Sequence, residues 1–405
     1  MLAALRSGSF VTGERLRVYS ALLLAGYVVA IVLLVAGSDG IVDAVGRPLG
    51  TDFANVYSAG KLALGGKAPL AYDWPAQHAA QKALSGRADI PFFPWHYPPT
   101  FLLVAAALAA LPYLAALAVY QAVTMGAYLA VVRRIAGRPE AWLAALAFPA
   151  AFVNVTHGHN GFLSAALIGG ALLVLDRRPL LAGVLIGCFA YKPQFGLMIP
   201  LVLAATGRWR VMAAAAATVL ALAGFTVAVF GSEVFAAFWQ SLPLARRVVL
   251  EGGPGFYKVQ SIYAALRLAG VPGAAANAMQ VLATLGVALA LIALWRSRAA
   301  FELKAAGLIV GSMLATPYAL DYDLVVLAPA IAFLAAHGLR EGFAPYEASL
   351  LAALWVLPLA ARSIALATSI SLTPIALIAA LGLILGRAGL LSLSPSSLTM
   401  GRGSG

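Results

Sequence analysis

The sequence predicts an all-α protein whose helices cross a membrane many times. Of its 405 residues, 62% are hydrophobic and only 10% are charged, and the mean hydropathy is +0.91. A soluble domain carries about 25% charged residues, and a much smaller share cannot cover a globule of this size. Long uncharged stretches alternate with short basic clusters along the chain. These observations exclude soluble, fibrous and disordered proteins, and the stretches predict about 11–13 membrane segments.

Basic residues predict how these segments are oriented. Lys and Arg exceed Asp and Glu by 12, and the positive-inside rule together with anionic membrane lipid explains this excess better than a nucleic-acid partner does. The basic clusters are Arg6/Arg15/Arg17, Arg133/Arg134/Arg138, Arg177/Arg178, Arg208/Arg210, Arg296/Arg298/Lys304, Arg340 and Arg387/Arg402. Two apolar stretches lie between most neighbouring clusters. We therefore assign all clusters to the cytoplasm and the intervening loops to the outside.

A single membrane domain is expected over residues 18–387, between a cytoplasmic N-terminus (1–17) and a disordered cytoplasmic tail (388–405). The uncharged stretch 18–36 exceeds the core of a cleavable signal, which has about 7–15 residues, and is expected to remain as an anchor. The lone cysteine, Cys188, excludes a disulfide within the chain and a cysteine-based metal site.

One stretch leaves the number of crossings open. Residues 100–132 are 33 uncharged residues, which as a helix span about 50 Å, too much for one crossing. Pro112 divides them either into a re-entrant half-helix and one crossing or into two crossings. Further along, Arg362 separates the uncharged stretches 348–361 and 363–386, which are expected as separate segments.

Residues 38–98 form the predicted first extracytoplasmic loop, with two short amphipathic helices. The first begins near Asp52 and stops at Gly65-Gly66, and the second covers 75–85. Asp52 either caps the first helix or, partly desolvated near the bilayer, acts as a general base, and the two roles are compatible. Asp73 is expected to cap the second helix. Four aromatic residues are expected to anchor the loop at the membrane surface: Tyr72, Trp74, Trp95 and Tyr97.

Several motifs resemble those of the GT-C glycosyltransferases, and most closely glycosyltransferase family 87, a mannosyltransferase-like group. In the first loop they are an early Asp, G-x-x-P-L-x-Y-D from Gly66 to Asp73, and Tyr97-Pro98-Pro99 opening the next helix. The likeness continues at H-G-H-N-G (157–161), Lys192-Pro193-Gln194 and T-P-Y-A-L-D-Y-D-L (316–324), so it covers most of residues 18–340.

This resemblance implies a multi-pass fold with its site on the non-cytoplasmic face and a polyprenyl-phosphate sugar as donor. It also implies an acidic catalytic base early in the first outer loop, and the matching position here is Asp52. Many GT-C enzymes have an acidic pair there, whereas this chain has Thr51-Asp52. A single acid argues against a metal bridging two carboxylates, so neither a metal nor a cofactor is expected.

Each of the other polar clusters on the outer side has a structural and a functional interpretation. His157, His159 and Asn160 either form a hydrogen-bonded turn or contact donor phosphate or sugar hydroxyls. Lys192, an ionisable residue at membrane depth, either snorkels to the surface or pairs with the donor phosphate, with Gln194 alongside.

The last two clusters also have two interpretations each. The loop 233–272 carries Arg246, Arg247 and a glycine-containing run with Lys258 and Gln260; it is either an ordinary solvated loop or a lipid-phosphate contact. Asp321 and Asp323 either cap the helix from 324 or bind substrate hydroxyls. The expected substrate-binding residues are Tyr57, Tyr97, His157, His159, Asn160, Lys192, Gln194, Lys258, Gln260, Asp321 and Tyr322.

The leading hypothesis is a membrane glycosyltransferase of the bacterial inner membrane. It moves a hexose or pentose, mannose-like by family, from a polyprenyl-phosphate sugar to a glycolipid or glycan acceptor on the periplasmic face, with inversion and with Asp52 as base. The alternative is a transporter of a polar solute or lipid, which Lys192 and the broken helices favour. The lack of an internal repeat and the long first loop disfavour it. A structural subunit is the third possibility.

Overall fold

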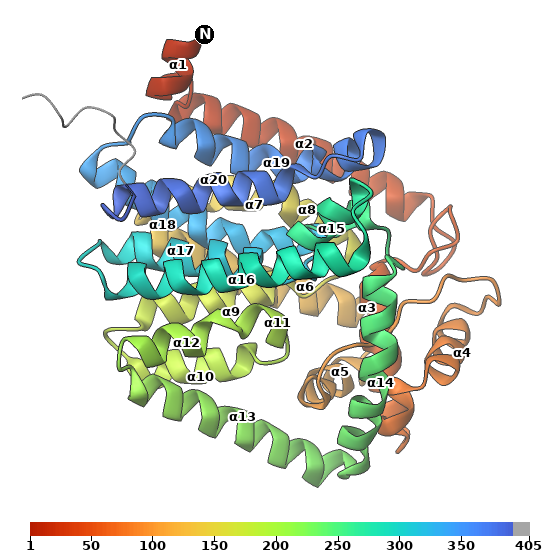
Figure 1. Cartoon of the computed structure of the whole chain (residues 1–405). Helices are drawn as coiled ribbons and strands as arrows, with labels where there is room; N and C mark the ends of the chain where they lie inside the picture. The colour runs from red at the N-terminus through yellow and green to blue at the C-terminus, as the bar shows by residue number, and fades with distance from the viewer. Residues whose placement is uncertain (392–405) are drawn as a thin grey trace, which may run out of the picture.

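A computed structural model describes residues 1–391 of the chain (Figure 1). These residues form helices and connecting turns, and no β-strand occurs among them. Six segments are long and apolar enough to cross a membrane: α2 (Gly13–Ala36), α6 (Tyr113–Ala136), α13 (Trp209–Phe230), α16 (Gly273–Arg296), Asp321–Glu341 and α19 (Glu347–Thr368). Five shorter apolar segments accompany them: Pro99–Ala109, Gly161–Val174, Pro179–Phe189, Pro193–Ala205 and Leu372–Arg387. The predicted all-α, multi-pass membrane fold is therefore confirmed.

The remaining elements are shorter. They are α1 (Leu2–Ser7), α3 (Thr51–Leu64), η1 (Ala68–Tyr72), α4 (Trp74–Ser85), η2 (Pro99–Phe101), α5 (Leu102–Ala109), α7 (Ala141–Leu146), α8 (Pro149–His157), α9 (Gly161–Val174), α10 (Pro179–Phe189), α11 (Pro193–Gly196), α12 (Met198–Ala205), α14 (Glu233–Leu250), η3 (Phe256–Lys258), α15 (Ile262–Leu268), α17 (Phe301–Ala315), η4 (Asp321–Val326), α18 (Leu327–Glu341) and α20 (Leu372–Arg387). Most of the predicted tail, 388–405, lies outside the described residues.

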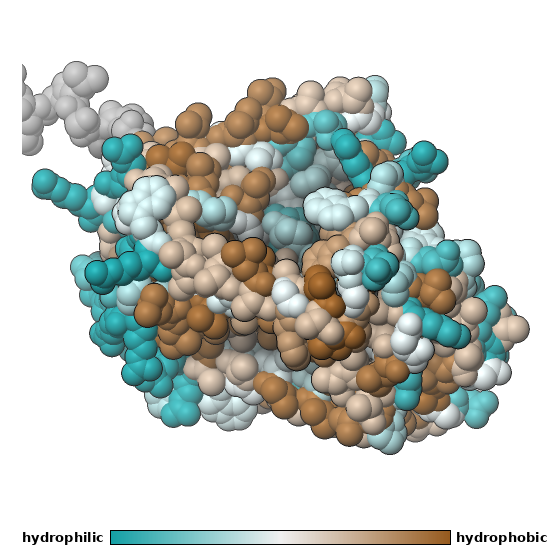
Figure 2. Space-filling view, turned by 90° about the horizontal axis from the view of Figure 1, so that it is seen from below, coloured by the Kyte–Doolittle hydropathy of each residue, from teal (hydrophilic) through white to brown (hydrophobic). Residues whose placement is uncertain are grey.

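The turns between the helices gather at two opposite ends of the molecule. The α9–α10, α12–α13 and α16–α17 turns, which carry three of the basic clusters, lie together at the left in Figure 1. We call this the basic end. Helices α3, α4, α14 and α15 lie toward the other end, which we call the loop end. Figure 2 shows hydrophilic residues along the left edge and many hydrophobic residues across the middle, the pattern of a protein whose belt faces lipid.

The stretch 100–132 contains one crossing and one half-helix. Helix α5 has 8 residues, about 12 Å at 1.5 Å per residue, which is too short to cross a bilayer. It packs against α3 so closely that a Cβ on Gly60 would clash with the backbone carbonyl of Ala105. Helix α6, with 24 residues, then makes the crossing. Of the two alternatives, these helix lengths favour a half-helix followed by one crossing.

The first loop contains the two predicted helices, and its aromatic residues lie deeper than expected. Helices α3 and α4 match the predicted ranges, and the Asp73 carboxylate caps α4 by accepting the Ala76 N–H at 2.9 Å. The expected surface anchors Tyr72 and Trp95 are wrong, because these side chains are only 5% and 0% exposed. They pack inside the loop instead, where the Tyr72 hydroxyl donates to the Tyr97 carbonyl.

Two segment boundaries also differ from those expected. Helix α19 runs without interruption through Arg362, so the expected division there is wrong. The predicted loop 233–272 contains the 18-residue amphipathic helix α14, which lies across the ends of the other helices in Figure 1. A single arginine does not end a helix, since its long side chain reaches a polar partner while the backbone stays helical.

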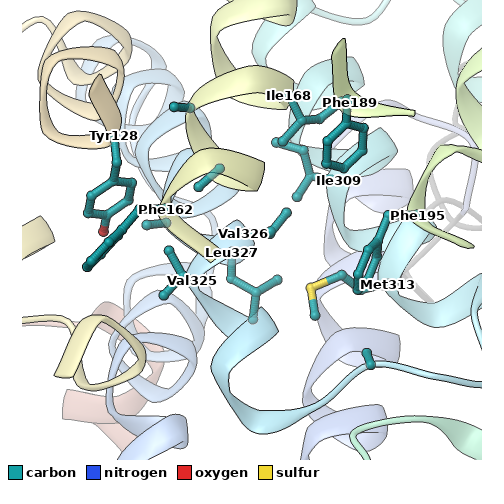
Figure 3. Close-up of a cluster of buried hydrophobic side chains, with 14 of the residues drawn as sticks. Tyr128, Phe162, Ile168, Phe189, Phe195, Ile309, Met313, Val325, Val326 and Leu327 are labelled. Atoms are coloured by element: carbon teal, nitrogen blue, oxygen red, sulfur yellow. The ribbon is translucent and has the colours of Figure 1, made fainter. Parts of the chain in front are cut away.

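An apolar core fills the space between the central helices. Figure 3 shows Val326 and Leu327 in the middle of one cluster, with Phe162 toward one side and Phe195 and Met313 toward the other. Phe162, Phe195 and Val325 each follow a polar motif by a few residues. The polar motifs therefore lie at the end of this packed core, which fixes their positions.

Candidate active site

Asp52 lies in the first turn of α3 at the loop end and is partly exposed. The N-cap of α3 is Gly50, with φ 67°, and no side chain caps this helix. The capping interpretation of Asp52 is therefore wrong, and its carboxylate has no hydrogen bond or ion pair among residues 1–391. Burial raises the pKa of Asp52 to about 6.

Four ionisable side chains from distant segments shape the electrostatic environment of this carboxylate. The charge of His157 lowers the pKa of Asp52, those of Asp321 and Asp323 raise it, and that of Lys192 lowers it. The outer loop, the α8–α9 turn, the α10–α11 break and η4 thus meet around Asp52.

Two glycines of the H-G-H-N-G turn explain how these segments come so close. Gly158 has φ 60°, and a Cβ on it would lie 2.7 Å from the Cβ of Phe53 and 3.1 Å from the Cα of Gly50. A Cβ on Gly161 would lie 2.8 Å from the carbonyl oxygen of Tyr322. The turn therefore touches the start of α3 on one side and η4 on the other, and only glycine fits at both contacts.

The same turn presents the two histidines differently. His159 is buried, its ring stacks on that of Tyr322 with centroids 3.6 Å apart, and its Nε2 lies 3.2 Å from the Tyr97 hydroxyl. His157 is partly exposed and donates from Nδ1 to the Val153 carbonyl at 2.8 Å, which leaves Nε2 free in the neutral ring.

Behind the histidines lies a polar network that the sequence analysis missed. Gln121 donates to the His159 carbonyl at 3.1 Å and accepts from Asn154, whose side-chain oxygen accepts the Gly161 N–H at 2.7 Å. The side-chain amide of the neighbouring Asn160 is buried and has no partner within the described part of the chain. Because uncharged Gln and Asn are common in helices, their spacing gave no signal.

Lys192 lies at the break between α10 and α11, where only 3% of it is exposed. Its Nζ lies 2.5 Å from Oδ1 of Asp323, whose Oδ2 accepts the Leu320 N–H at 2.9 Å. The snorkelling interpretation is therefore wrong, since the ammonium group points to a buried carboxylate. Gln194, two residues on, is partly exposed and makes no side-chain hydrogen bond among the described residues.

Asp321 pairs with an arginine that the sequence analysis used only to divide two segments. Its Oδ2 lies 3.2 Å from NH1 of Arg362, on α19. The signal was available, because Arg362 is a lone cation within an apolar segment and an ionisable residue at membrane depth has a functional role by default. The argument that singled out Lys192 applies equally to Arg362.

The glycine-containing run 252–261 packs beside η4. Val259 bridges Leu320, and the Gln260 N–H donates to the Ala319 carbonyl at 2.6 Å. The Gln260 side chain accepts from Thr373 at 2.5 Å, so this residue holds the run to α20. Lys258 is partly exposed next to the ring of Tyr257.

Tyr57 lies apart from this group of charges. Its hydroxyl donates to the Leu111 carbonyl at 2.7 Å, and its ring packs against Phe53 and Tyr113. Tyr57 and Gln260, both expected to bind substrate, thus use their polar atoms to hold the fold together. Neither residue therefore belongs to the proposed site.

Fold and site together define a multi-pass membrane protein with a group of acids and cations at its loop end. The family model of glycosyltransferase family 87 matches residues 95–317, more than half of the chain. The chain belongs to this family, and it is a glycosyltransferase. The match includes the histidine turn and Lys192, whereas Asp52 precedes it. No curated protein and no solved structure matches the chain.

Proposed function

We propose that the protein transfers a hexose or pentose, mannose-like by family, from a polyprenyl-phosphate sugar to a glycolipid or glycan acceptor. The reaction takes place at the periplasmic face of the bacterial inner membrane. Membership of glycosyltransferase family 87 supports the sugar-transfer chemistry. The position of Asp52 at the end opposite the basic turns supports the periplasmic face, because basic turns stay in the cytoplasm.

The observation that carries the proposal is the unpaired carboxylate of Asp52. Asp321 and Asp323 each have a cation within 3.2 Å, so their lone pairs are engaged. Asp52 has no such partner in the described chain, it is partly exposed, and burial raises its pKa to about 6. A carboxylate of this kind is a good general base near neutral pH.

Asp52 removes the proton of an acceptor hydroxyl as its oxygen attacks the anomeric carbon. The leaving group is a phosphate, which is stable as an anion and needs cations rather than a protonating acid. One base without a paired acid favours single displacement, so the new glycosidic bond has the inverted configuration. The rings of His157 and Tyr322 lie near each other and are both partly exposed, which supports a role for these two residues in contacting the sugar.

The test is transfer from a panel of polyprenyl-phosphate sugars by purified protein, measured as release of polyprenyl phosphate. Asp52→Asn is expected to lower the rate at least about 100-fold, the usual contribution of a general base. Asp89→Asn is the matched control, because Asp89 belongs to the same loop, is 76% exposed and lies outside the site. A folded Asp52→Asn protein with full activity would remove Asp52 from this role.

A further inference from the structure

The phosphate of the proposed donor needs a cation, and Lys192 is poorly placed to supply it. Lys192 and Asp323 are 3% and 5% exposed at their side chains, and their charges neutralise each other at 2.5 Å. A phosphate that displaced Asp323 would leave a buried carboxylate without its partner, which is costly. Lys192 therefore positions Asp323 and η4 and is not the main phosphate ligand.

Arg362 has the properties that Lys192 lacks. Its side chain is 38% exposed, although it arises from a membrane-spanning helix. A guanidinium has five N–H donors, and within residues 1–391 only NH1 has a protein acceptor, Asp321 at 3.2 Å. This single bond orients the planar group and leaves the other donors available, which suits a tetrahedral oxyanion.

A second cation lies against the same aromatic ring as Arg362. The Cζ of Arg362 and the Nζ of Lys258 each lie 5.8 Å from the centroid of the Tyr257 ring. The bridge from Val259 to Leu320 and the Gln260–Thr373 bond hold this run against η4 and α20. Both cations thus lie around one ring, and within residues 1–391 the carboxylate that pairs with Arg362 is that of Asp321.

We propose that Arg362 and Lys258, arranged around Tyr257, form the phosphate-binding site for the polyprenyl-phosphate group. This inference rests on the proposed function. Two cations against one carboxylate leave a single positive charge, which matches the single negative charge of a phosphodiester donor.

The same arrangement favours the forward reaction. The bond between the anomeric carbon and the phosphate oxygen breaks, and its electron pair stays on that oxygen. The acceptor oxygen forms the new bond to the anomeric carbon, and its proton passes to Asp52. The phosphate changes from a diester with one negative charge to a monoester that carries up to two. Arg362 therefore interacts more strongly with the departing group than with the donor, which lowers the barrier.

Binding of farnesyl phosphate, farnesol and inorganic phosphate to the full chain in nanodiscs tests this site. Arg362→Gln is expected to weaken farnesyl phosphate binding about tenfold or more, the effect of one charged hydrogen bond, and to leave farnesol binding unchanged. Arg87→Gln is the matched control, because Arg87 is 43% exposed, pairs with the carboxylate of Asp89 away from the site, and its replacement removes the same charge. If inorganic phosphate competes only weakly with farnesyl phosphate, the site binds lipid phosphate rather than free anions.

Asp321→Asn separates binding from a structural role of Arg362. If Arg362 served only to neutralise Asp321, this variant would behave like Arg362→Gln, whereas we expect it to bind farnesyl phosphate at least as tightly as the unmodified protein. Equal binding by Arg362→Gln and Arg87→Gln, with sugar transfer intact, overturns this inference and leaves the proposed function standing. Loss of transfer from every phospho-sugar by the unmodified protein overturns the proposed function instead.

Discussion

At the scale of single residues, the site is a set of charges in which one carboxylate, that of Asp52, has no partner among residues 1–391. Lys192 pairs with Asp323 and Arg362 with Asp321, at 2.5 and 3.2 Å. Only the more distant charges of His157 and Lys192 lower the pKa of Asp52, so the effect of burial dominates and the pKa rises to about 6. The pairs hold the site in shape, and the unpaired group is available for chemistry.

The pH dependence of activity should report Asp52 directly. Only the deprotonated carboxylate accepts a proton, so the transfer rate is expected to increase as pH rises through about 6 and then to level off. The maximal transfer rate is measured at a series of pH values from well below to well above this pKa. A rate that stays flat across the window would argue against Asp52 as the titrating base.

The same shift makes a prediction for stability. The ordinary pKa is 3.8, and the folded value is about 6, so the folded protein binds more protons than the unfolded chain between these values. Stability due to Asp52 therefore falls as pH rises through this window, and the charged carboxylate destabilises the fold above it. Asp52→Asn should raise the thermal midpoint near neutral pH and have little effect at low pH. A lower midpoint near neutral pH would contradict this.

The buried pair between Lys192 and Asp323 predicts non-additive substitutions. Removing one partner leaves a buried charge, so Lys192→Met should cost about 3–5 kcal/mol of stability. The double variant Lys192→Met, Asp323→Asn should be less destabilised than Lys192→Met alone, because no charge then remains unpaired. Thermal midpoints in detergent for the two single variants and the double variant measure this coupling.

At the scale of elements, glycine contacts decide which segments can meet. Gly60 lets α3 lie against α5, and Gly158 lets the α8–α9 turn lie against α3. The half-helix α5 thus supports α3 from one side while the histidine turn supports it from another. The position of Asp52 depends on both contacts, although neither contains a catalytic group.

Gly158→Ala tests whether this packing positions the site. Gly158 and Gly66 have similar backbone angles, φ 60° and 70°, but a Cβ on Gly66 would meet nothing within 4 Å. Gly66→Ala should therefore lower the free energy of unfolding by only about 1–2 kcal/mol, the cost of a non-glycine residue in the left-handed conformation. Gly158→Ala should cost more and should also lower the transfer rate, because the turn must move away from α3. Equal effects of the two substitutions on both rate and midpoint would show that close packing is unimportant here.

At the scale of the whole molecule, the two ends have different compositions. The basic turns lie at one end and the first loop, α14 and the acidic residues around Asp52 lie at the other. The apolar belt between them fixes the orientation in a bilayer, since charges that cross it are costly. The site is therefore placed on one face of the membrane by features that lie far from it.

Cysteine labelling tests this orientation in cells. In a Cys188→Ser background, Lys67→Cys on the first loop should react with a membrane-impermeant maleimide added outside intact cells. Arg177→Cys, in the α9–α10 turn, should react only after the membrane is permeabilised. Both positions are exposed, so a difference in labelling between them reports the side of the membrane on which each one lies. Labelling of both in intact cells would contradict the orientation.

The sequence by itself determined the features that depend on neighbours along the chain. The apolar lengths indicated the membrane fold, the basic clusters marked one end, and the cap at Asp73 was evident from local pattern. The motif residues Asp52, His159 and Lys192 were also identified, because polar residues are conspicuous in an apolar chain.

Only the tertiary structure decided which of these residues meet. Lys192 and Asp323 are 131 positions apart, Asp321 and Arg362 are 41 apart, and Tyr97 and His159 are 62 apart. No periodicity relates such distant positions, so the sequence left open whether Asp52 was a cap and whether Lys192 reached the surface, and it wrongly divided α19 at Arg362. These choices depend on packing free energy across several helices, which a local pattern of polar and apolar residues does not contain.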